Sequence, residues 1–147
     1  MLRNKRFGLI LLTVAFIGGF VFGNLLQTQE IVSAQSDRVF ELRTYTTNDG
    51  KLPNLLTRFR DHTTRIFEKH GMTNVGYWVP EDAKDHPAST LIYVISHDSR
   101  DAATENWQAF RDDPEWKQVA EESQRDRRIV ANVESVFMKA TDFSRLH

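Results

Sequence analysis

Residues 38–80 read RVFELRTYTTNDGKLPNLLTRFRDHTTRIFEKHGMTNVGYWVP, and this stretch decides the fold. The alternation within Val39–Thr46 predicts a β-strand, which ends at the turn residues that follow it. Apolar residues at three- and four-residue spacing predict an amphipathic helix from Leu52 to His70, and Gly71 is a typical helix stop. Thr73–Val79 is a second predicted strand, so this stretch forms half of a small α+β domain.

The remainder of the chain supplies the second half. Thr90–His97 is apolar on both faces and predicts a covered strand. A helix follows from Asp98 or Ser99 to Phe110, Asp113-Pro114-Glu115 begins another helical segment, and Ile129–Ala140 is the last strand. The order β-α-β-β-α-β is that of ferredoxin-like domains. Its helices cover one sheet face, so the second apolar face predicts sheet-to-sheet pairing of two copies as a dimeric α+β barrel.

The first 34 residues have the pattern of a targeting segment. Three basic residues precede an apolar run, and a more polar stretch ends in Val32-Ser33-Ala34. Small or apolar residues three and one before a possible cut after Ala34 favour a cleaved signal peptide, with the domain spanning residues 35–147. The alternative is an uncleaved anchor, in which Phe7–Gly23 is the only membrane contact. Both alternatives predict an exported domain, periplasmic or extracellular, or anchored outside the cytoplasm.

Composition excludes several classes of function. The first 34 residues hold three of the 19 basic and one of the 20 acidic residues, which leaves 16 against 19 in the domain. A mildly acidic domain with interspersed charges does not predict nucleic-acid binding. The chain has no cysteine, which excludes disulfides, thiol nucleophiles and thiolate metal sites.

The amino-acid sequence resembles the NIPSNAP family over about residues 38–143. The resemblance is carried by ELRTYT, Gly50-Lys51-Leu52, Lys69-His70-Gly71, Val75-Gly76-Tyr77-Trp78 and DPEW at Asp113–Trp116, together with Phe59 and His62. It implies a ferredoxin-like fold and a homodimer formed by sheet-to-sheet packing. It implies no particular reaction.

A few residues are candidates for a site. His62 is the best candidate for a catalytic group, because it projects from the apolar stripe of its helix or from the border of that stripe. The alternative is a histidine that bonds a strand carbonyl and fixes the helix. Two His eight residues apart, His62 and His70, lie two helical turns from each other, so the spacing predicts no metal site.

Glu41, Arg43 and Tyr45 alternate on one face of the first strand, and we expect Trp78 to face the same space. With Tyr93 they are the candidate lining of a pocket for an acidic or planar ligand. The alternative is an ion pair between Arg43 and Glu41 on a solvent-facing or dimer-facing surface.

Two functions follow from these patterns. The first is a dimeric module, without a cofactor, that binds a small ligand or a partner protein. The second is an enzyme of the dimeric α+β barrel type, either a cofactor-independent monooxygenase or a haem-modifying protein. The sequence favours the module, because no base and orienting group can be placed together.

Overall fold

The computed structural model describes residues 37–146. The predicted signal peptide or anchor therefore lies outside the described residues. The strands are β1 (Val39–Thr47), β2 (Thr73–Trp78), β3 (Thr90–His97) and β4 (Val130–Met138). The helices are α2 (Leu52–Arg58), the π-helical turn η1 (Phe59–Thr63), α3 (Thr64–Lys69), the 3-10 turn η2 (Ala83–Asp85), α4 (Arg100–Asp112) and α5 (Pro114–Ser123).

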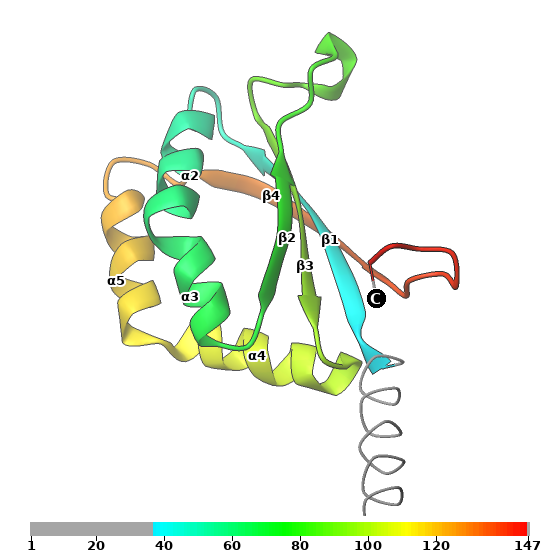
Figure 1. Ribbon diagram of the computed structural model, residues 1–147. Helices are drawn as coiled ribbons and strands as arrows, with labels where there is room; N and C mark the ends of the chain where they lie inside the picture. Colours follow the sequence, from blue (N-terminus) through cyan, green and yellow to red (C-terminus); the bar gives the residue numbers. More distant parts are fainter. Residues whose placement is uncertain (1–36, 147) are drawn as a thin grey trace, which may run out of the picture. The chain divides into compact units, whose positions relative to one another are not determined.

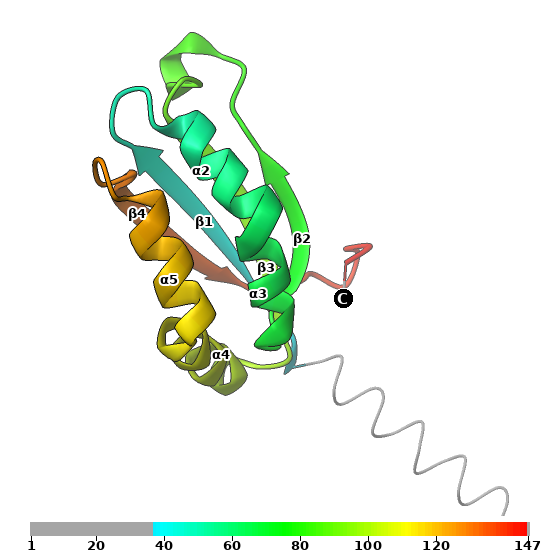
Figure 2. The same ribbon diagram turned by 90° about the vertical axis from the view of Figure 1, so that its left-hand side faces the viewer.

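The four strands form one antiparallel sheet in the order β2-β3-β1-β4. The helices lie on one face of this sheet, with α2 and α3 beside α5 and with α4 crossing one end (Figures 1 and 2). This arrangement confirms the predicted ferredoxin-like α+β fold. In this sheet order β1 and β3 are the two central strands.

The helix boundaries follow local chemistry. Pro53 lies in the first turn of α2, where its missing N–H leaves no hydrogen bond unmade. The Ser99 hydroxyl accepts a hydrogen bond from the Ala102 N–H at 3.0 Å and caps α4. Gly71 has φ +75°, a left-handed conformation that suits glycine and ends the α2–η1–α3 helix. The predicted start, stop and restart of the helices are confirmed.

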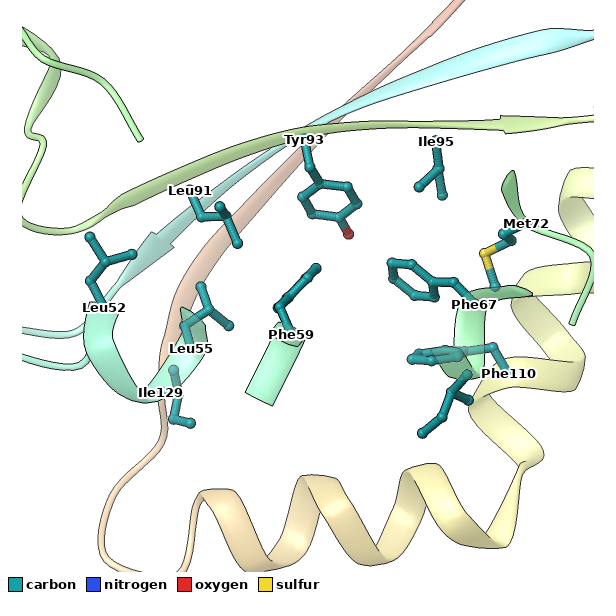
Figure 3. Close-up of a cluster of buried hydrophobic side chains, with 11 residues drawn as sticks. Leu52, Leu55, Phe59, Phe67, Met72, Leu91, Tyr93, Ile95, Phe110 and Ile129 are labelled. Atoms are coloured by element: carbon teal, nitrogen blue, oxygen red, sulfur yellow. The ribbon is translucent and has the colours of Figure 1, made fainter. Parts of the chain in front are cut away.

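The core lies between the helices and the sheet. Tyr93 of β3 is directed toward the space between Phe59 and Phe67, and ring centroids there are 5.2 Å and 6.0 Å from the Tyr93 ring (Figure 3). Burying each such aliphatic or aromatic side chain contributes about 1.5–3 kcal/mol. The surrounding buried residues are Leu52, Leu55, Ile66, Met72, Leu91, Ile95, Phe110 and Ile129.

The opposite face of the sheet carries a second apolar set. Strand register places Leu42 beside Val94 and Val136, and Thr44 beside Ile92. Trp78 is 52% exposed and Val136 54% exposed, although both are large apolar side chains. β3 is thus apolar toward both faces, as its sequence predicts, while the pairing of two copies stays a prediction.

Between residues 37 and 146, no helix has both the length and the apolar composition needed to cross a membrane.

Candidate functional site

A cleft of about 520 Å³ opens between β1 and β4 on one side and α4 and α5 on the other. We call it the sheet–helix cleft. Its volume lies in the range of small-molecule sites. Its lining combines one acidic residue with basic, aromatic and small residues, namely Glu41, Arg43, Tyr45, Arg100, Ala103, Thr104, Trp107, Phe110, Arg111, Trp116, Ser135 and Phe137.

Glu41 is the buried centre of this cleft and is only 1% exposed. One carboxylate oxygen, Oε1, accepts hydrogen bonds from Arg43 Nη1 and Ser135 Oγ, each at 2.6 Å. The other, Oε2, accepts from Trp107 Nε1 at 2.6 Å and from His97 Nε2 at 3.2 Å. Four donors from β1, β3, α4 and β4 therefore converge on one carboxylate, and Glu41 ties the sheet to α4.

This environment keeps Glu41 ionised. Burial alone would raise the pKa of its carboxyl, but hydrogen bonds from His97, Ser135 and Trp107, together with the Arg43 charge, lower the pKa to about 2. A carboxylate with so low a pKa is a poor acceptor of a proton near neutral pH. The geometry therefore gives Glu41 a role in organising the cleft.

The same network fixes the tautomer of His97, which is 1% exposed. Asn106 Nδ2 donates to the Gly71 carbonyl at 3.0 Å and lies 3.3 Å from His97 Nδ1. Because Asn106 presents a donor to Nδ1, the Nε2 N–H is the group that donates a hydrogen bond to Glu41 Oε2. His97 thus connects Asn106 of α4 to the Glu41 carboxylate.

Arg43 has one nitrogen bound to Glu41 and a side chain that is 16% exposed. Its guanidinium carbon lies 4.3 Å from the centre of the Trp107 ring and 5.5 Å from that of Tyr45. Its Nε is buried and makes no hydrogen bond within the described residues. Arg43 therefore carries an unused donor in the wall of the cleft.

Two further arginines increase the positive charge of the lining. Arg100 stands at the start of α4, with its guanidinium carbon 3.5 Å from the centre of the Phe137 ring. Arg111 lies in the last turn of α4, where its Nη2 donates to Gln108 at 2.9 Å. Neither side chain is held by a carboxylate within residues 37–146. The lining thus has three guanidinium groups against the single carboxylate of Glu41.

The structure brings together four of the six residues that the sequence singles out. Glu41, Arg43 and Tyr45 line the cleft, and Tyr93 lies directly opposite Arg43 on β3, buried behind it. The Arg43–Glu41 ion pair is present, but it lies beneath the helices and not on a solvent-facing surface. These four residues therefore lie on the helix-covered side of the sheet and not on the face expected to line a barrel interior, and their role in binding a ligand stays a prediction.

Trp78 was expected to face the same space, and this expectation is wrong. Trp78 lies opposite Ile92, whereas its neighbour Tyr77 lies opposite Tyr93 and shares the helix-covered face with Arg43. Alternation places successive residues of a strand on opposite faces, so Trp78 is on the helix-free face. Its ring folds back over Gly76, where an added Cβ would meet it at 2.5 Å.

His62 also lies elsewhere. It is exposed and does not project from the apolar stripe, because η1 is a π-helical turn. The Thr64 N–H donates to the Phe59 carbonyl, five residues back, and the wider turn places Thr63 on the buried side where His62 was expected. Strand-carbonyl bonding by His62 is not observed among its described contacts, and the residue lines a different cleft, between α2 and α5.

Several site residues escaped the sequence argument. His97, Trp107 and Ser135 reach Glu41 from 56, 66 and 94 residues away along the chain. His97 alone carried a local signal, because it continues the alternation of Leu91, Tyr93 and Ile95 beneath the helices. Arg100 and Arg111, eleven residues apart, lie three turns apart on one side of α4, a spacing that could have indicated a shared surface.

Within the part of the chain that the structure describes, no group of three or more histidine and acidic side chains is placed to hold a metal ion.

Comparison with known proteins gives a consistent result. The profile of the NIPSNAP family matches residues 40–145. A NIPSNAP family protein of unknown function from Agrobacterium tumefaciens has a solved structure that is 26% identical, with a TM-score of 0.65 over 76% of this chain and 96% of that one. A NIPSNAP-like domain protein from Burkholderia xenovorans is 12% identical, with a TM-score of 0.64 over 74% and 90%.

A more distant structure is that of SnoaB, a cofactor-independent oxygenase from Streptomyces nogalater, in a mutant form. It is 15% identical, with a TM-score of 0.48 over 74% of this chain and 98% of that one, and it indicates no activity here. The search of curated proteins found no match.

Proposed function

The chain belongs to the NIPSNAP family, and on that premise we propose that it is a dimeric module that binds a small, planar, anionic ligand in the sheet–helix cleft. A single observation carries the proposal. Three arginines and several aromatic rings line a cleft whose one carboxylate, Glu41, is already bound by four donors. The unbalanced positive charge favours an anion, and the rings favour a flat one.

The proposed ligand is an aromatic or conjugated carboxylic acid. Guanidinium groups bind carboxylates through paired N–H donors, and Arg100 and Arg111 stand at opposite ends of the α4 wall with no carboxylate of their own. Trp107 is held in place by its hydrogen bond to Glu41, so its ring is a fixed wall against which a planar group can stack. Glu41 would organise this wall without contributing a free acceptor.

The test compares benzoate with benzamide, its neutral analogue, by isothermal titration calorimetry on the purified chain. Benzoate is expected to bind more tightly than benzamide. The double variant Arg100→Gln/Arg111→Gln is expected to weaken benzoate binding about tenfold, because a charge-assisted hydrogen bond contributes roughly 1.5–3 kcal/mol. Arg127→Gln is the matched control, since Arg127 is exposed and lines neither cleft.

Equal binding of the charged and neutral probes would contradict the proposal. An equal loss in the double variant and in Arg127→Gln would contradict it as well, because the effect would then reflect overall charge and not the cleft.

We infer the dimer from the helix-free face. Leu42, Ile92 and Val94 are apolar there, and Trp78 and Val136 are more than half exposed. A contiguous exposed apolar patch on a sheet is normally covered, and two copies of the same sheet can cover each other about a two-fold axis.

Light scattering after size-exclusion chromatography tests this inference. The chain is expected to run as a dimer at micromolar concentration, and Val136→Glu is expected to shift it to a monomer. Val133→Glu is the control, because Val133 is also exposed on β4 but lies on the other face, opposite Tyr45. A monomeric wild-type chain would contradict the inference.

A further inference from the structure

Arg58 is a buried cation with few partners. It is the last residue of α2 and is 6% exposed. Its guanidinium carbon lies 5.3 Å from the centre of the Trp116 ring on α5. Within residues 37–146, the one hydrogen bond that its guanidinium makes runs from Nη1 to Ser123 Oγ at 3.3 Å, and its buried Nε has no partner.

Other buried charges in the described domain are neutralised. Glu41 has Arg43, and Asp113 has Lys69 and His70 at 2.7 Å and 2.5 Å. Within the same residues, no carboxylate approaches Arg58 within 4.0 Å. Burial accordingly lowers the pKa of Arg58, and the nearby Tyr45 and Tyr93 offset only part of that effect. An uncompensated buried charge is costly, so its retention calls for a partner.

Arg58 lines a cleft of about 420 Å³ between α2 and α5, two helices that contact each other over the same face of the sheet (Figure 2). Around Arg58 the cleft presents hydrogen-bonding side chains from both helices, including Asn54, Thr57 and Ser123. Glu122 also lies in the lining, is exposed, and accepts a hydrogen bond from Gln118 at 3.0 Å. The cleft therefore has room and donors for a small ligand beside the buried cation.

The π-helical turn contributes a further donor. It places Thr63 in the core, where its hydroxyl donates to the Arg58 carbonyl at 3.2 Å, and it places His62 on the cleft. Single π-helical turns within α-helices occur frequently at functional sites. Here the turn directly follows Arg58 and brings His62 into the same lining.

We propose that the α2–α5 cleft is a second binding site, in which Arg58 holds the carboxylate or phosphate group of a small molecule. The Arg58 guanidinium would bind the oxyanion through its Nη nitrogens, with Ser123 and His62 as supporting donors. This site lies apart from the sheet–helix cleft and is independent of the function proposed for it.

The test follows amide NMR signals during titration with inorganic phosphate, with acetate, and with sodium chloride at matched ionic strength. Phosphate or acetate is expected to cause saturable shifts in residues 54–63 and 119–123, and the stronger of the two identifies the group recognised. His62→Gln and Ser123→Ala are expected to weaken binding a few-fold, and Arg58→Met to abolish it. Glu122→Gln is expected to strengthen binding, because it removes a repelling charge.

Arg60→Gln is the matched control, since Arg60 is exposed and does not line the cleft. The Arg100→Gln/Arg111→Gln variant separates the two sites and is expected to leave these shifts unchanged. Shifts equal to those caused by chloride would overturn the proposal. So would binding that survives in His62→Gln, Ser123→Ala and Arg58→Met alike, or binding lost equally in Arg60→Gln.

Discussion

Two arginines of the domain, Arg43 on strand β1 and Arg58 at the end of helix α2, are in opposite states. Arg43 is bound to Glu41, whose remaining lone pairs are filled by His97 and two further donors. Arg58 is more deeply buried than Arg43, yet its guanidinium has only a weak hydrogen bond, to Ser123. The difference indicates that the first charge is part of the fold, whereas the second is a charge that the fold tolerates. Removing one partner of a buried ion pair destabilises the folded protein, whereas removing a lone buried charge lowers its stability little.

The largest effect is expected from Glu41→Gln. An amide would present its NH₂ to groups that are themselves donors, and it would leave Arg43 buried without a counter-charge. The free energy of unfolding is expected to fall by about 3 kcal/mol. Urea unfolding at pH 7 measures it. Glu122→Gln, an exposed residue of the other cleft, is the control and is expected to change stability by less than ~0.5 kcal/mol.

The pH dependence of stability tests the contribution of the Glu41 carboxylate without a mutation. The folded-state pKa of Glu41, about 2, lies below its ordinary value of 4.5, so its contribution is complete above about pH 4.5 and is lost as pH falls toward 2. That contribution is on the order of 3 kcal/mol. Asp113 adds to the acid sensitivity, because hydrogen bonds from Lys69 and His70 lower its pKa too.

The difference between wild type and Glu41→Gln, measured by urea unfolding from pH 6 to pH 2.5, isolates the contribution of Glu41. The two curves are expected to converge as pH falls. Parallel curves would show that Glu41 is not the titrating group.

The sequence predicted the fold and part of this network. Strand alternation was enough to place Glu41, Arg43 and Tyr45 on one face, and the helix signals located α2, α4 and α5. Apart from the Arg43–Glu41 ion pair, it did not predict the partners of Glu41, since they come from strands and a helix that are distant in the sequence. For the same reason, the sequence-based prediction placed Trp78 on the face of Arg43, whereas it lies on the helix-free face.

His62 was misplaced for a different reason. A helix of uniform pitch puts residues 55, 59, 62 and 66 on one face, whereas the π-helical turn replaces the third of these with Thr63. No local residue pattern predicted that turn. The α2–α5 cleft was therefore not predicted from the sequence, although both of its helices were.

Substituting each arginine by methionine sharpens the comparison. Arg43→Met would leave the Glu41 carboxylate buried with three of its four donors and without its guanidinium partner. Arg58→Met would fill similar space beside Trp116 and remove an unneutralised charge. In phosphate-free buffer, Arg43→Met is expected to be about 2 kcal/mol less stable than Arg58→Met. Thermal and urea unfolding of both variants measure this, and equal losses would show that Arg58 is as much a part of the fold as Arg43.

The smallest effects on stability are expected from substituting the two serines, Ser135 beside Arg43 and Glu41, and Ser123 beside Arg58. Ser135 donates to the buried Glu41 carboxylate at 2.6 Å, whereas Ser123 receives a longer bond of 3.3 Å from Arg58. Ser135→Ala is expected to lower the free energy of unfolding by about 1 kcal/mol, and also to raise the pKa of Glu41, because one donor to the charged form is lost. Ser123→Ala is expected to have less than half that effect on stability. Urea unfolding at pH 7 and pH 3 measures both variants. A larger loss in Ser123→Ala would mean that the contact with Arg58 stabilises the fold, and the α2–α5 cleft would then need no ligand to account for its buried cation.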